Sequence, residues 1–142
     1  MATLLPKTEV QLYTKGSSMK KLQEYFESTK GLGVLATADS NGKVDAAIYS
    51  RPHFLEEGTM AFIMRDRLTH HNLQSNPSAT FLFIEEKAGY NGKRLFLKKV
   101  REENNPELIK KIKRRTFSDD DMALTFLVYF TLEKELPLIG DK

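Results

Sequence analysis

The chain has 142 residues, of which 40% are hydrophobic and 29% are charged, so we expect one globular domain over residues 1–142, with 1–16 as an N-terminal arm. It contains no cysteine, which excludes a disulfide framework, a thiol nucleophile and a thiolate metal site. The net charge of +3 weakly favours an anionic ligand, and the lack of a long apolar run or an apolar leader predicts a cytoplasmic protein without a membrane segment.

The first predicted element is an amphipathic helix that ends near residue 29. Ser17 or Ser18 can cap its N-terminus, because a serine hydroxyl accepts a hydrogen bond from an unpaired amide of the first turn. Gly31 fits the end of the helix. One face of this helix is apolar and is predicted to pack on the core; it carries Met19, Leu22, Tyr25 and Phe26.

A β-hairpin is predicted to follow the helix, with an apolar strand over 33–38 and a returning strand over 44–51. Residues 39–42, Asp-Ser-Asn-Gly, form a strong turn signal because Asn and Gly tolerate positive φ. Ala46 and Ala47 are small and leave space beside the returning strand. Either a planar ring or a bulky neighbouring side chain can fill that space.

The stretch from 59 to 86 predicts a strand over 59–64, a charged loop, a short helix over 70–75 and a second strand over 78–84. Thr69 is positioned to cap the helix, and Asn76-Pro77 ends it because the residue before a proline is pushed out of the α region.

The start of this short helix is a candidate anion site. A helix that begins beside Arg65 and Arg67 presents free amides, the positive end of its dipole and two guanidinium groups to one point, and phosphate suits this arrangement best. The alternative is that both arginines are solvated loop charges and that Thr69 serves only as a cap.

The rest of the chain predicts two more strands, over 93–100 and 124–132, and an apolar tail over 136–140. Asn105-Pro106-Glu107 is predicted to open a helix between these strands, whose buried residues are Leu108, Ile109 and Ile112. Six strands joined mostly by tight turns indicate a mainly β (α+β) fold, an antiparallel barrel with one helix before it and one inserted late.

The order and spacing of these segments resemble the flavin-binding split barrels of the pyridoxamine 5'-phosphate oxidase family. The matching segments are 33–37 with Asn41-Gly42, Phe62-Ile63-Met64, Thr69, 72–77 (Asn-Leu-Gln-Ser-Asn-Pro) and 80–83 (Thr-Phe-Leu-Phe). The resemblance covers roughly 32–100, with a weaker match at 128–140. It implies a six-stranded antiparallel split β-barrel with flanking helices, which binds FMN at the interface of a homodimer.

The resemblance also implies which residues contact the cofactor. The flavin ring edge would meet the backbone of Ala47, Ile48 and Tyr49, with Ile63 and Met64 nearby, and the phosphate would lie among Arg65, Arg67, Thr69 and His70. Arg51 is a second phosphate candidate, and Arg94 falls where the family places a polar flavin contact. The family usually has a lysine where Thr69 stands, so we hypothesise that Arg65 or Arg67 supplies the missing charge.

The function implied by the resemblance is that of an FMN-dependent oxidoreductase of unknown substrate. Oxidation of pyridoxamine phosphate itself is not expected, because the chain has no tryptophan and no histidine after His71, whereas the true oxidases carry both in a C-terminal substrate segment. The alternatives are a deazaflavin-dependent reductase, a non-catalytic flavin or haem carrier or sensor, and a cofactor-free split barrel that works by interaction.

Other chemistries have less support in the sequence. His70 and His71 are adjacent on a predicted helix, so their side chains point about a hundred degrees apart and chelate one metal poorly. The sequence has no Ser-His-Asp order and no paired-carboxylate pattern that would indicate hydrolysis. The basic run over 110–115 is typical of a solvated helix face, and no stacked-aromatic strand motif accompanies it, so nucleic-acid binding is not expected.

Overall fold

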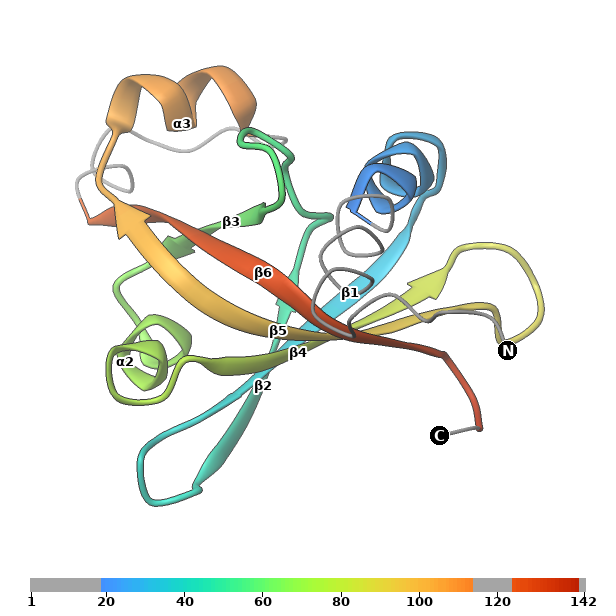
Figure 1. Ribbon diagram of the computed structural model, residues 1–142, viewed down its shortest axis with the longest axis horizontal. Coiled ribbons are helices and arrows are strands. Elements are labelled where there is room, and N and C mark those ends of the chain that lie inside the picture. Colours follow the sequence, from blue (N-terminus) through green and yellow to red (C-terminus); the bar gives the residue numbers. More distant parts are fainter. Residues whose placement is uncertain (1–18, 114–123, 141–142) are drawn as a thin grey trace, which may run out of the picture.

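Figure 1 shows the computed structural model, which describes residues 19–113 and 124–140. The strands are β1 (Gly31–Ala38), β2 (Val44–Tyr49), β3 (Met60–Arg65), β4 (Ser78–Glu85), β5 (Gly92–Glu103) and β6 (Thr125–Pro137). The helices are α2 (Leu68–Ser75), α3 (Pro106–Ile112) and a helix over residues 19–28 that precedes β1. The predicted arm over 1–16, the cap at Ser17 or Ser18 and the end of the basic run at 114–115 lie outside the described residues.

The six strands form one antiparallel sheet in the order β2-β1-β4-β5-β6-β3. The sheet is curled, so that β2 and β3, which lie at opposite ends of this order, form the two edges of a split barrel (Figure 1). One short bridge approaches the β3 edge, where His53 and Ala61 exchange two backbone hydrogen bonds of 2.8 Å each. The predicted mainly β fold of six antiparallel strands is therefore confirmed.

The β1–β2 hairpin forms at the predicted turn. The Asp39 side chain accepts hydrogen bonds from the amides of Asn41 and Lys43, both at 2.9 Å, and Gly42 has a φ of +83°. Such a φ favours glycine, because a side chain crowds the backbone in the left-handed region. The register pairs Ala38 with Val44 and Gly33 with Tyr49.

Gly31 does not end the preceding helix, as the sequence suggested, but opens β1. A Cβ atom at this position would lie 2.2 Å from the carbonyl oxygen of Ile84 on β4. The glycine is therefore required by the close approach of two strands, and the helix already ends at residue 28.

Phenylalanine rings pack together in the centre of the barrel core, among aliphatic side chains. Phe62 of β3 and Phe81 of β4 lie 4.9 Å apart between ring centroids, and Phe26 lies 5.0 Å from Phe83. The predicted apolar face of the first helix is confirmed, since Met19, Leu22 and Phe26 are buried and Tyr25 packs against the same cluster. Because one face of this helix covers the barrel, burial of apolar surface holds it there.

A smaller second core lies under α3. Ile109 is fully buried with Ala61, Leu127 and Tyr129, and the predicted partners Leu108 and Ile112 pack against this group. The predicted cap is also confirmed, because Asn105 Oδ1 accepts a hydrogen bond from the Leu108 amide at 3.1 Å. Among the described helices, none is long and apolar enough to cross a membrane.

Candidate cofactor-binding site

A cleft of about 710 Å³ lies between the edge strands β2 and β3, at the start of α2. Its volume is in the range of roughly 300–1,000 Å³ that is usual for small-molecule sites. Both edge strands contribute side chains to it, together with the first residues of β1 and α2 and with Lys113, which follows α3. The cleft is therefore built where the barrel is split.

One wall of the cleft is apolar and open to solvent. Ile48 of β2 is 66% exposed, Leu68 of α2 is 55% exposed and Leu32 of β1 is 48% exposed. Ala47 and Ile63 continue this wall from the two edge strands. Large apolar side chains gathered around a concave surface are typical of binding sites.

The cleft also carries three cationic side chains, Arg65, Arg67 and Lys113. Its part beside the two arginines and the start of α2 is called the cationic end. Arg67 is the N-cap of α2, and its side chain makes no capping hydrogen bond. The first helical bond of α2 runs from the amide of His71 to the carbonyl of Arg67, at 2.9 Å. The amides that precede His71 in the first turn point out of the helix without an intrahelical partner, and their partial positive charge adds to that of the arginines.

The predicted cap at Thr69 is wrong. The helix begins at Leu68, two residues earlier than expected, because the chain turns directly after β3, where the Arg67 amide donates to the carbonyl of Arg65 at 2.9 Å. Thr69 consequently lies inside the first turn, and its hydroxyl donates to Asp45 Oδ2 of β2 at 3.4 Å.

Asp45, Thr69 and Tyr49 form a polar group on the side of the cleft formed by β2. Burial raises the pKa of Tyr49, the nearby Thr69 hydroxyl lowers it, and the charge of Asp45 raises it further, with a net upward shift. The Tyr49 hydroxyl therefore keeps its proton at neutral pH and is a hydrogen-bond donor in the cleft.

Seven of the eleven predicted site residues line this one cleft: Ala47, Ile48, Tyr49, Ile63, Arg65, Arg67 and Thr69. The sequence analysis missed Asp45, His53 and Lys113, which also line it. Asp45 was detectable, because it stands two and four residues before Ala47 and Tyr49 and alternate residues of a strand share a face.

The other four predicted residues are engaged elsewhere. Met64 is buried in the barrel core, on the face of β3 opposite to Ile63, and His70 is buried between two carboxylates. Arg94 donates to the carbonyl of Pro137 at 2.9 Å and to that of Gly140. Arg51 donates from Nη1 to the carbonyls of Phe26 and Thr29, at 2.8 and 3.1 Å.

The contacts of Arg51 indicate that it stabilises the end of the first helix, whose last carbonyls lack helical partners. We expect Arg51→Ala to lower the free energy of unfolding by about 1.5–3 kcal/mol, the usual value for hydrogen bonds to a charged group. Urea denaturation measures the loss. The matched control is Lys30→Ala, which removes an exposed cation at the same helix end. A loss equal to that of the control, or a large fall in affinity for FMN, would contradict this role.

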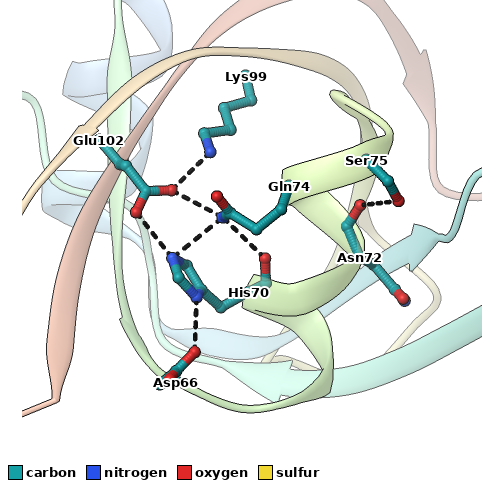
Figure 2. A network of polar contacts seen from close by, with 7 residues as sticks. All are labelled: Asp66, His70, Asn72, Gln74, Ser75, Lys99 and Glu102. Carbon is teal, nitrogen blue, oxygen red and sulfur yellow. Dashed lines mark hydrogen bonds and ion pairs between the residues drawn. The ribbon is translucent and has the colours of Figure 1, made fainter.

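Glu102 of β5 is the centre of a network of polar contacts behind the first turn of α2 (Figure 2). It accepts from Lys99 Nζ at 2.5 Å and from the Gln74 amide at 2.9 Å, and its second oxygen lies 2.8 Å from His70 Nε2. Burial raises the pKa of Glu102, but the bonds from Gln74, Lys99 and His70 outweigh it and lower the pKa to about 2.

This shift predicts a loss of stability in acid. Because the folded pKa of Glu102 lies below the ordinary value of 4.5, its contribution is complete above that pH and is lost as the pH falls toward 2. As the pH falls through this window, we expect the wild type to lose about 1–2 kcal/mol more unfolding free energy than Glu102→Gln does, after allowance for solvent screening. The measurement is urea denaturation at several pH values, with the exposed Glu133→Gln as control. Parallel profiles for the two variants would contradict the assignment.

Among the described residues, no three His, Cys, Asp or Glu side chains are grouped so that they could hold a metal ion. His70 pairs with carboxylates through both ring nitrogens, and His71 is exposed on the same helix. The two histidines therefore have different environments.

No protein-family model matches the sequence, and no curated protein matches it either. Solved structures do. An FMN-binding protein from Syntrophomonas wolfei superposes with a TM-score of 0.67 at 19% identity, covering 96% of both chains. An F420 reductase superposes with a TM-score of 0.64 at 15% identity, covering 82% of this chain and 94% of the reductase chain. A protein from Lactobacillus delbrueckii assigned as a pyridoxamine 5'-phosphate oxidase superposes with a TM-score of 0.59 at 14% identity, covering 82% of this chain and 91% of its own.

These structures define the class of fold: the chain is a split barrel of the kind seen in pyridoxamine 5'-phosphate oxidase-like proteins. The resemblance inferred from the sequence motifs is confirmed in the fold, over nearly the whole of the chain.

Proposed function

We propose that the protein is a homodimeric FMN-binding split barrel of the cytoplasm that acts as a flavin-dependent oxidoreductase. The observation that carries this proposal is the pairing of an open apolar wall with a cationic helix start in one cleft. A flavin mononucleotide has a flat, largely apolar ring at one end and a phosphate at the other. Two structural neighbours, the FMN-binding protein and the F420 reductase, support a cofactor of this general kind.

The residues of the cleft fit FMN. Ala47 of β2 and Ile63 of β3 face the cleft from its two sides and would hold the ring, with the backbone of Ile48 and Tyr49 at its edge. Arg65, Arg67 and the free amides of α2 would hold the phosphate. The bound flavin would supply the electron-transfer chemistry, while these residues bind and orient it.

A homodimer is proposed because apolar surface surrounds the cleft. Val44, on the same edge strand as Ile48, is 79% exposed, and Leu32 and Leu68 are exposed at the rim. A second chain laid over β2 would bury these side chains and would also cover the edge strand. Arg94 does not line the cleft of its own chain, so its predicted flavin contact would require the second chain.

The test is an absorption spectrum of the purified protein after incubation with FMN and desalting, beside a parallel sample with riboflavin, which lacks the phosphate. We expect flavin bands that remain with the protein for FMN and are largely lost for riboflavin, and light scattering that reports a dimer. A protein that retains neither flavin would overturn the proposal, and a Soret band would indicate a haem carrier.

The second candidate is a deazaflavin-dependent reductase, which the likeness to the F420 reductase favours. The same desalting experiment with the deazaflavin cofactor separates the two, because retention of the deazaflavin without FMN would support only the reductase. Oxidation of a reduced nicotinamide by the FMN-loaded protein would support an enzyme. A bound flavin without turnover would support a carrier or sensor.

A further inference from the structure

His70 is the most enclosed charged or titratable side chain at the start of α2, with only 7% of its side chain exposed. Its Nδ1 lies 3.0 Å from Asp66 Oδ1, and its Nε2 lies 2.8 Å from Glu102 Oε2. The ring also stacks on Phe126 of β6, with a centroid distance of 4.1 Å and an interplanar angle of 7°. Figure 2 shows the ring between the two carboxylates, which come from opposite sides.

The two carboxylates define the protonation that this geometry requires. A neutral imidazole has one N–H and donates one hydrogen bond, whereas the protonated ring donates from both nitrogens. Both Asp66 and Glu102 accept, so the ring bonds both of them only when it is protonated. A neutral ring would leave one carboxylate oxygen facing a nitrogen lone pair.

The surrounding charges agree with a protonated ring. The groups that contact the ring are Asp66 from the turn before α2, Glu102 from β5, and Gln74 from α2, whose Nε2 lies 3.1 Å from His70 Nε2; Lys99 of β5 pairs with Glu102. The Gln74 amide already donates to the His70 carbonyl at 3.0 Å and to Glu102 at 2.9 Å. Two carboxylates and Lys99 leave one negative charge, which a protonated His70 balances.

The position of this network in the chain connects it to the cleft. Asp66 and His70 bracket Arg67, Leu68 and Thr69, and these three residues line the cationic end and the rim of the cleft. Glu102 lies on β5, which does not line the cleft, so the contact from His70 ties the bracketed turn to the body of the barrel.

We propose that His70 is a positioning residue for the phosphate end of the cleft: its protonated ring, bonded to Asp66 and Glu102, fixes the first turn of α2 and with it Arg67 and the helix amides. This role rests on the proposed function, because it concerns the anion end of the same cleft. His70 does not contact the ligand, and loss of its proton releases one of the two carboxylates.

The test compares His70→Gln with His71→Gln, which changes the adjacent exposed histidine. A third variant, Asp66→Asn, removes the charge of a half-exposed partner of His70, so it is expected to fold even if His70→Gln does not. In the wild-type protein without ligand, NMR at about pH 6 is expected to show protected protons on both ring nitrogens of His70 and on neither of His71. Amide exchange is read at residues 66, 67 and 71, whose amides are bonded at 3.0, 2.9 and 2.9 Å.

We expect these amides to exchange about tenfold faster in His70→Gln and Asp66→Asn, and the dissociation constant for FMN to rise by about tenfold, with neither change in His71→Gln. A single ring proton, unchanged exchange, or FMN affinity that His70→Gln leaves intact would each overturn the proposal. If the wild-type protein binds no FMN, only the proposed function fails. The ring protons and the amide exchange rates are measured without ligand, so they still decide whether His70 fixes the turn.

Discussion

The double variant Arg65→Ala/Arg67→Ala is expected to bind FMN about 100-fold more weakly than the wild type, or worse. Each guanidinium lost from a phosphate removes a charge-assisted hydrogen bond of about 1.5–3 kcal/mol, and about 2.7 kcal/mol corresponds to a factor of 100. The effect is large because Thr69 stands where related proteins usually have a lysine, and its hydroxyl is bonded to Asp45. Quenching of FMN fluorescence at fixed ionic strength measures the affinity.

The control for net charge is Lys20→Ala/Lys21→Ala, which removes two exposed cations from the first helix. We expect this variant to bind FMN as the wild type does. Riboflavin provides the second control, since the arginine variant should bind it with little change if the two side chains act on the phosphate. Undiminished FMN affinity would remove Arg65 and Arg67 from the site, and an equal loss for riboflavin would indicate a general disturbance of the cleft.

Phe81→Ala is expected to cost about 3–5 kcal/mol of unfolding free energy, the largest stability effect that we predict. Phe81 is fully buried on β4, and its ring lies 4.9 Å from that of Phe62 and 6.1 Å from that of Phe26. Its removal therefore opens a cavity among the first helix, β3 and β4, which rigid strands cannot close. Urea denaturation followed by circular dichroism measures the change.

Phe96→Ala is the matched control for Phe81. Phe96 pairs directly with Thr80 on the same sheet but lies half-exposed on the outer face of β5, with Lys134 Nζ 5.6 Å from its ring centroid. We expect Phe96→Ala to lower the unfolding free energy by about 1 kcal/mol or less, because the ring lies outside the core and its removal leaves no buried cavity. Equal losses for the two phenylalanines would show that Phe81 is not central to the packing.

Local patterns were sufficient to predict most of the fold. Alternating apolar residues, the Asn41-Gly42 turn and the Asn105 cap act over a few residues, and each appears where it was expected. The strands β5 and β6 extend beyond the predicted 93–100 and 124–132, and the prediction stopped short because the outer parts carry charged residues. Each outer part is kept extended by pairing with the predicted part of the other strand, as Glu103 pairs with Leu127 and Lys134 with Phe96.

The candidate site was predictable in part for the same reason. Ala47 and Tyr49 share a face of β2, and Ile63 faces the cleft while its neighbour Met64 faces the core, so the period of two would have excluded Met64. The partners of Arg51, and Glu102 as the partner of His70, come from elements 22 or more residues away in the sequence. Such partners are set by the assembled barrel and leave no local signal.

The pairing of β3 with β6 also sets the order in which the barrel can be completed. Arg65 pairs with Thr125, so this ladder joins residues 60 positions apart, and closing such a loop costs about 2 kcal/mol more than closing a four-residue hairpin. On a ribosome that adds about 5–20 residues per second, the apolar strand β3 waits roughly 3–12 seconds for its partner to be synthesised. During that interval β3 lacks its ladder partner, and an unpaired, apolar strand of this kind is the part of a nascent chain that is most exposed to pairing with other chains.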